Sequence, residues 1–197
     1  DFPIAISTTR PETKLGDTGV AVHPDDTRYQ KYIGQEFDLE FAGTPIHIKI
    51  VADKDADPAF GTGAVGITPA HSHIDWEIGT RHKLLIKQVI NEFGKIVNAS
   101  EKLNGKKVVE AREEIVAWIK ENNLLEKEEE INQNIATAER TGGIIEPLPK
   151  LQWFIDVNKK ISSRENKSLK ELMLEPAQEK KIKIIPEHFE KVYFNWI

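Results

Sequence analysis

Residues 60–75 read Phe60-Gly61-Thr62-Gly63-Ala64-Val65-Gly66-Ile67-Thr68-Pro69-Ala70-His71-Ser72-His73-Ile74-Asp75, and this stretch sets the pattern of the fold. Its short apolar run, 64–67, lies between a glycine-rich turn and a proline, as is typical of a β-strand. Ser72 then stands where a helix N-cap is expected, and Ile74 and Ile78 have the spacing of one helical face. The stretch predicts a strand followed by a short helix over 71–82.

The flanking sequence continues this alternation. Short apolar runs broken by Gly, Pro and Asp predict four further strands, at 4–7, 19–22, 45–51 and 85–90. Residues 106–122 predict a helix, because their apolar side chains recur on one helical face. Beyond them, 159–175 predicts a charged helix and 182–185 a closing strand. The order of elements indicates a β-rich α+β domain with a helical and extended C-terminal segment.

Composition narrows the class of protein. The 197 residues suffice for one compact domain with a core, and 39% apolar with 30% charged residues is ordinary for a globular chain. No apolar run approaches the roughly 20 residues that cross a bilayer. The absence of cysteine excludes disulfides, thiolate zinc sites and cysteine nucleophiles, and it fits a cytosolic protein. A net charge of −5 argues against bulk electrostatic coating of nucleic acid.

The two ends of the sequence suggest a segment of a longer protein. The chain opens on Asp1-Phe2-Pro3-Ile4, already typical of a strand. It closes on an aromatic cluster, 193–197, which we expect to be buried.

The densest motif is Ser7-Thr8-Thr9-Arg10-Pro11-Glu12-Thr13, where hydroxyls, a guanidinium and a carboxylate follow an apolar run. Polar donors crowded at a strand end suit a ligand that carries hydroxyls and a phosphate or carboxylate. A capped turn explains the same residues without any ligand. The run Phe60-Gly61-Thr62-Gly63 likewise lets backbone approach a ligand, and by itself also fits a simple turn or bulge.

Asp75 has a structural explanation beside any functional one. Ser72 as N-cap and Asp75 three residues later form a capping box. A metal site is another interpretation, since His71, His73, Asp75 and His82 are suitable ligands, although residues two apart do not share a helical face. Farther along, a basic stretch could meet RNA but is interrupted by glutamates. Its members are Lys159, Lys160, Arg164, Lys167 and Lys170.

The chain resembles the editing domain inserted in class I aminoacyl-tRNA synthetases. The resemblance rests on the order and spacing of three motifs, which are Thr8 to Thr13, Gly61 to Val65, and Thr68 to His71 with Asp75. Leucyl enzymes typically carry Asp where Glu12 stands, and isoleucyl enzymes have a different, Trp-containing Thr-rich segment. Further stretches are similar to the valyl branch, namely 22–29, Ile145-Glu146-Pro147, Gln152-Trp153-Phe154 and 186–196.

The resemblance implies an α+β fold with a β-barrel-like core and peripheral helices, inserted in a Rossmann-type catalytic domain. It implies an editing core over 1–150, and over 151–197 an extension that returns toward the catalytic domain. The signature segments of the synthetic site are absent, so no cofactor or metal is expected here and ATP belongs to the synthetic domain. The expected partners are the 3′ end of tRNA(Val) mischarged with threonine and the rest of the synthetase, in a cytoplasmic monomer without a membrane anchor.

The resemblance also implies roles for individual residues. Asp75, Thr9 and His71 form the expected catalytic set: Asp75 holds the α-ammonium of the substrate, and His71 borders the pocket and helps to order it. Arg10 and Thr13 line the amino-acid pocket. The other expected substrate-binding residues are Thr8, Ile74 and the wall that receives the terminal adenosine, made of Phe60, Gly61 and Thr62.

The implied reaction is hydrolysis of the aminoacyl ester by a positioned water, helped by the vicinal ribose hydroxyl, because the sequence offers no dedicated general base. A polar second site is needed because a hydrophobic pocket rejects an added hydroxyl only weakly. The chain departs from many valyl enzymes at Ser72 and Gly66, where they carry Asp and Lys that are associated with the pocket. The alternatives are a leucyl or isoleucyl type of editing domain, a tRNA-binding module without catalysis, and a metal-dependent hydrolase.

Overall fold

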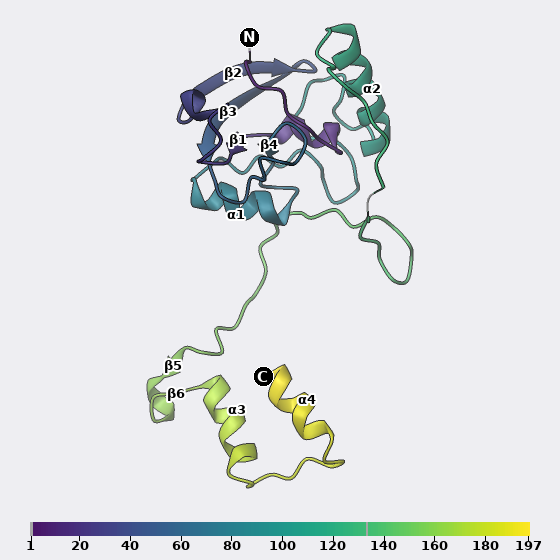
Figure 1. Cartoon of the computed structure of the whole chain (residues 1–197). Coiled ribbons are helices and arrows are strands. Elements are labelled where there is room, and N and C mark those ends of the chain that lie inside the picture. Colours follow the sequence, from purple (N-terminus) through teal and green to yellow (C-terminus); the bar gives the residue numbers. More distant parts are fainter. Residues whose placement is uncertain (1, 133) are drawn as a thin grey trace. The chain divides into compact units, whose positions relative to one another are not determined.

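The computed structural model describes residues 2–132 and 134–197, which form two compact units, Asp1–Lys150 (unit 1) and Leu151–Ile197 (unit 2). Asp1 and Gln133, both within the predicted editing core, lie outside the described residues. Figure 1 labels the elements of both units.

Unit 1 is built around an open, mixed four-stranded sheet. Its strands are β1 (Gly19–Val22), β2 (Glu36–Phe41), β3 (Thr44–Ala52) and β4 (Ala64–Ile67). They lie in the order β2-β3-β1-β4, with β1 parallel to β3 and antiparallel to β4. The predicted strands 19–22 and 64–67 are confirmed with the same bounds, and 45–51 falls within β3.

Strand β2 was not predicted, although its sequence carries the signal. In Glu-Phe-Asp-Leu-Glu-Phe, the apolar residues alternate with acidic ones, and the structure alternates between half-buried and exposed positions. The two-residue turn Ala42-Gly43, with φ of +50° and +73°, joins β2 to β3 as a tight hairpin whose turn matches the twist of the strands.

The two faces of the sheet are covered differently. Helix α1 (His73–Arg81) packs Ile78 against Ala21, Val51 and Ile67 on one face. The opposite face carries a second cluster, which is closed by the N-terminal segment. Its buried members are Ile4, Val20, Val22, Ile48, Ile50 and Ala64.

Helix α2 (Val108–Glu121) confirms the helix predicted over 106–122. Its apolar side chains Ala111 and Ile115 are fully buried beside Leu15, which belongs to the short helix η1 (Pro11–Gly16). This third cluster holds η1 in place, and η1 in turn positions the polar residues Lys14 and Asp17, which follow the Thr-rich motif.

The expected barrel-like closure is corrected by the structure: the described residues form an α+β fold with an open sheet rather than a closed barrel. The predicted strand 4–7 does not pair, because its side chains cover the sheet face instead of extending its edge. The predicted strand 85–90 is reduced to one isolated bridge between Ile90 and Ile96.

Unit 2 differs from its predicted layout. Short strands β5 (Lys160–Ile161) and β6 (Lys167–Ser168) precede helix α3 (Leu169–Gln178), so the helix predicted over 159–175 begins later. The left-handed residues Glu165 and Asn166 reverse the chain, and Ser168 with Glu171 forms the capping box that starts α3.

The remainder of unit 2 also departs from the expectation. The predicted strand 182–185 is irregular, and the aromatic end forms helix α4 (Phe189–Trp196), in which no residue is buried within unit 2 and Trp196 is 80% exposed. Across the described parts of both units, none of the helices combines the length and apolar character needed to cross a bilayer.

The packing of α2 leads to a stability prediction. Ile115→Ala leaves a cavity against Leu15 and is expected to lower the free energy of unfolding by roughly 2–5 kcal/mol in urea titrations. Val109→Ala on the same helix, where the side chain is 65% exposed, should change it by less than about 0.5 kcal/mol. Equal losses for the two variants would contradict the docking of α2 described above.

Candidate functional site

The three motifs of the sequence meet in unit 1. Gly61 has a φ of +55° and passes so close to Ser7 that a Cβ atom at Gly61 would overlap the Ser7 side chain. The glycine therefore allows the Thr-rich segment and the glycine-rich turn to lie side by side.

The end of β4 is tied to η1 by a buried polar group of three residues, the Lys14 cluster (Lys14, Asp17 and Thr68). Lys14 Nζ donates to Asp17 Oδ1 at 2.9 Å, to the Gly66 carbonyl at 3.1 Å and to Thr68 Oγ1 at 3.3 Å. Thr68 Oγ1 in turn donates to Asp17 Oδ1. Burial raises the pKa of Asp17, against the opposing effects of Lys14 and Thr68.

Asp75 is attached to the same turn. Its Oδ2 accepts a hydrogen bond from the Thr68 backbone N–H at 2.9 Å, and its own N–H donates to Ser72 Oγ at 3.3 Å. The N-cap role of Ser72 is confirmed, but the carboxylate of Asp75 bonds to Thr68 rather than back to the cap. The predicted capping box is therefore only half formed, because the carboxylate is used to fix the strand-to-helix turn.

His71 is buried and committed to the fold. Its Nε2 accepts hydrogen bonds from the backbone N–H groups of Val89 and Ile90, at 3.0 and 3.2 Å. Because an accepting nitrogen carries no proton, the ring proton of the neutral imidazole is on Nδ1. Nδ1 lies 3.2 Å from Glu146 Oε1, off the line of an ideal hydrogen bond, and neither atom has another partner among residues 2–132 and 134–197. His71 can order the site but cannot accept a proton at Nε2 without losing two backbone hydrogen bonds.

Glu146 joins His71 to the Thr-rich motif. Its Oε2 accepts from Arg10 Nη2 at 2.6 Å, and Arg10 Nε donates to Glu12 Oε1 at 3.2 Å. Glu12 is fully buried, and Arg112 on α2 binds both of its oxygens at 2.8 Å. Burial alone would raise the pKa of Glu146, but His71 and Arg10 hold it below its usual value.

The other predicted site residues differ in their exposure to solvent. Thr8 and Thr9 are exposed, and Thr8 Oγ1 accepts from the Arg10 N–H. Thr13 is buried and donates its hydroxyl to the Arg10 carbonyl at 3.0 Å, which makes it part of the turn. Phe60, on the glycine-rich turn, is 56% exposed.

Two further predicted residues complete this part of unit 1. The carbonyl of Thr62 accepts from the Tyr29 hydroxyl at 2.7 Å, which anchors the glycine-rich turn. Ile74 is 62% exposed on the first turn of α1.

The motifs of the sequence indicated no role for the charged residues that hold the site together. They are Glu12, Lys14, Asp17, Arg112 and Glu146. Only Glu12 and Glu146 carried a signal, as parts of the motifs that set the valyl branch apart.

The metal alternative gains no support from the geometry. Within 2–132 and 134–197, no three His, Asp or Glu side chains gather in a metal-binding arrangement. His82 Nε2 instead lies 2.7 Å from Asp53 Oδ2, in a separate ion-pair group with Arg81.

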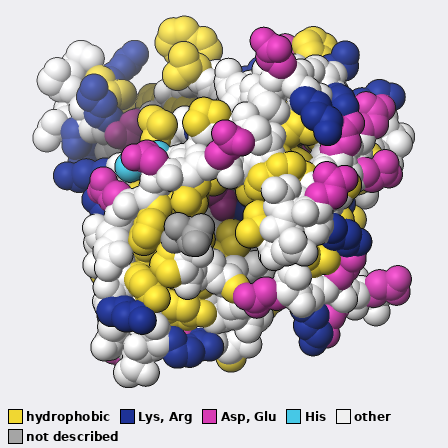
Figure 2. Space-filling view, turned by 90° about the horizontal axis from the view of Figure 1, so that it is seen from above, with side chains coloured by type: hydrophobic (Ala, Val, Ile, Leu, Met, Phe, Trp, Pro, Cys, Tyr) yellow, Lys and Arg dark blue, Asp and Glu magenta, His cyan; other side chains and the backbone are white. Residues whose placement is uncertain are grey.

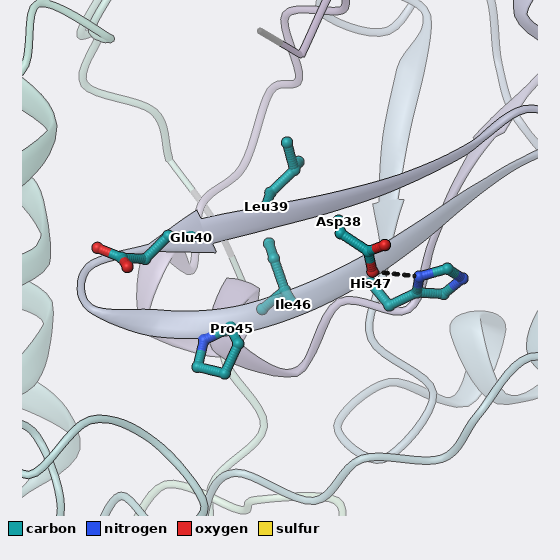
Figure 3. Close-up of a pocket in the computed structure, with 6 residues that line it drawn as sticks. All are labelled: Asp38, Leu39, Glu40, Pro45, Ile46 and His47. Atoms are coloured by element: carbon teal, nitrogen blue, oxygen red, sulfur yellow. Dashed lines mark hydrogen bonds and ion pairs between the residues drawn. The ribbon is translucent and has the colours of Figure 1, made fainter.

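A hollow of about 440 Å³ lies elsewhere, on the hairpin β2–β3 (Figure 3). His47 Nδ1 lies 2.8 Å from Asp38 Oδ1 at its side. The residues lining this hollow include none of the predicted site residues, and they are Asp38, Leu39, Glu40, Pro45, Ile46 and His47.

Positive and negative side chains lie close together on the face that Figure 2 shows and in the basic stretch of unit 2. In the space-filling view of Figure 2, cationic and anionic side chains are interspersed on the face shown. In the basic stretch of unit 2, Lys160 pairs with Glu171, and Lys167 lies 2.6 Å from Glu175. A solvated, ion-paired surface accounts for these two lysines.

Comparison with known proteins identifies the family. No protein-family model matches the chain. The valine–tRNA ligase of Clostridium acetobutylicum is 43% identical over 197 residues, covering 100% of this chain and 21% of the relative. That of Carboxydothermus hydrogenoformans is 42% identical over 194 residues, or 98% of this chain and 21% of the relative. The chain belongs to the valine–tRNA ligase family. It spans about a fifth of the length of the valine–tRNA ligases that it matches.

A solved structure is also similar. The LeuRS of Agrobacterium radiobacter K84, in a ternary complex with tRNA and LeuAMS, has a TM-score of 0.41 and 21% identity, covering 60% of this chain and 17% of that chain.

The ion pairs of Glu146 predict how the stability of this valine–tRNA ligase region depends on pH. A carboxyl whose pKa is lower in the folded state stabilises the fold above its ordinary value, 4.5, and this stabilisation is lost as the pH falls through the lowered folded value. Wild type should therefore lose unfolding free energy as the pH is lowered through 4.5 and below, and Glu146→Gln should lose less over the same range. Glu126→Gln, at an exposed position, serves as the control. Identical pH profiles for wild type and Glu146→Gln would show that the pairing is absent.

Proposed function

We propose that unit 1 is the editing domain of a valine–tRNA ligase and hydrolyses threonyl-tRNA(Val). Membership of the family supports the link to tRNA(Val), and the meeting of the three motifs in one place supports a site. The observation that carries the proposal is the carboxylate of Asp75, held by the Thr68 N–H at the turn between β4 and α1.

In the proposed complex, Asp75 binds the α-ammonium of threonine. Its Oδ2 is oriented by Thr68, and a carboxylate can accept further hydrogen bonds from a ligand. A charged hydrogen bond to the ammonium fixes the ester carbonyl beside it. Valine has the same ammonium, so discrimination rests on the side-chain hydroxyl of threonine, and the exposed Thr8 and Thr9 hydroxyls are partners of the right chemistry.

The terminal adenosine of tRNA is proposed to lie against Phe60, Gly61 and Thr62. Phe60 offers an exposed ring for stacking, and glycine backbone allows close approach. Arg10 is proposed to line the pocket. Because its guanidinium already binds Glu12 and Glu146, its main role is to order the Thr-rich segment.

The proposed chemistry is water attack on the ester carbonyl. The carbonyl carbon gains the water oxygen, the bond to the ribose oxygen breaks, and the proton lost by water passes to that oxygen, helped by the vicinal ribose hydroxyl. The products are free threonine and tRNA with an intact 3′ end. Because His71 is bound at Nε2 by two backbone N–H groups, the rate depends on positioning rather than on a histidine base.

The test is single-turnover deacylation, with the chain in excess over threonyl-tRNA(Val) or valyl-tRNA(Val). We expect faster loss of threonine, unaffected by EDTA. Asp75→Asn keeps an acceptor for the Thr68 N–H but removes the charge, and should slow the reaction by about 10- to 100-fold, the worth of one charged hydrogen bond. Glu77→Gln, exposed on the same helix, is the matched control.

The other outcomes separate the alternatives. Binding of tRNA by a folded chain without hydrolysis of either ester would overturn the proposal in favour of a tRNA-binding module. Faster hydrolysis of misacylated tRNA(Leu) or tRNA(Ile) would indicate another type of editing domain. Loss of activity in EDTA would indicate metal-dependent hydrolysis.

A further inference from the structure

Lys14 is an unusual residue in this fold because its ammonium is buried. The residue is only 7% exposed, and the two side chains to which it donates, those of Asp17 and Thr68, are buried as well. A buried ammonium is costly unless it is paired and its donors are satisfied. Lys14 meets this condition with three acceptors: Asp17 in the turn after η1, the Gly66 carbonyl in β4 and Thr68 just after β4.

Gly66 provides the space for this ammonium. Gly66 pairs with Val20 in the sheet and does not have the positive φ that would favour glycine. A Cβ atom at Gly66 would overlap Asp17 Oδ2 and lie 2.8 Å from Lys14 Nζ. Glycine is therefore favoured at this position for a steric reason, because the Lys14 cluster occupies the space that a side chain would need.

The cluster is connected to Asp75 through Thr68. The Thr68 hydroxyl is held by Lys14 and Asp17, while its backbone N–H holds the Asp75 carboxylate. The Lys14 ammonium pairs with the Asp17 carboxylate. Burial, and to a smaller extent the charge of Asp75, raise the pKa of Asp17, and Lys14 opposes them. Without the ammonium, repulsion between the two carboxylates would act directly on the turn that carries Asp75.

We propose that Lys14 is the positioning residue of Asp75, and that an ammonium reaching the same space from residue 66 can replace it. This inference rests on the proposed function for the role of Asp75, but not for the coupling of Lys14 to Gly66. Lys14 touches no substrate; it fixes Asp17 and Thr68, and Thr68 orients the carboxylate that binds the ammonium of the amino acid.

The first test is a cycle of three variants. Lys14→Met removes the charge with little change of shape, Gly66→Lys adds a competing ammonium, and the double variant moves the ammonium to residue 66. Each single change should lower the thermal unfolding midpoint, and the double variant should recover part of the loss. Lys54→Met, at an exposed position, should leave the midpoint unchanged. Additive losses in the double variant would overturn the proposed replacement.

The second readout follows the turn itself and does not depend on activity. The amide proton of Thr68, which donates to Asp75 Oδ2, should shift in the NMR spectrum of Lys14→Met and return toward its original position in the double variant. A Thr68 amide unmoved by Lys14→Met would overturn the positioning role, even if the variant were less stable.

The kinetic readout separates this inference from the proposed function. Single-turnover kcat/KM for threonyl-tRNA(Val) should fall at least about tenfold in Lys14→Met, the effect of roughly 1.4 kcal/mol, and recover in the double variant. Full activity in Lys14→Met would overturn the role of Lys14 while leaving the function standing. Absence of activity in wild type, with the midpoint and Thr68 shifts as expected, would reject the function and keep the coupling.

Discussion

The buried pair of Lys14 and Asp17 is the interaction on which the candidate site depends. It joins η1, the following turn and the end of β4 at one point, and Thr68 carries the connection to Asp75. Burying these charges is favourable only because each has several partners, so the geometry tolerates little change. The same pair accounts for Gly66, because a side chain at this position would meet the Asp17 carboxylate and the Lys14 ammonium.

A second charged network holds the other side of the site. Glu146 lies more than 130 residues after Arg10, yet it accepts a hydrogen bond from Arg10 and faces His71. Arg112 extends the network to α2 through the buried Glu12. Because Arg10 and His71 both interact with Glu146, their side chains are held in fixed positions at the edge of the site. In the proposed reaction, the site therefore acts by orienting the ester, the attacking water and the α-ammonium.

The sequence predicted the parts of the fold that depend on local pattern. Strands 19–22 and 64–67 and helix α2 have clear apolar runs or helical periodicity, and Ser72 is a sound N-cap. Closure of a barrel was not predictable, because pairing of segments such as 4–7 is decided by tertiary packing rather than by β propensity. The contacts of Lys14 with Gly66 and of Glu146 with Arg10 could not be predicted from the sequence either, because each joins residues that are distant in sequence.

The central claim is that the turn around Asp75 and the exposed threonines binds a threonyl ester. Its most direct test is binding of a non-hydrolysable amide analogue of 3′-threonyl adenosine, followed by backbone amide shifts, with the valyl analogue as the comparison. The account predicts tighter binding of the threonyl analogue and shifts centred on residues 7–10, 60–63 and 68–75. Equal affinity for the two analogues, or shifts centred on the hollow of the hairpin β2–β3, would contradict it.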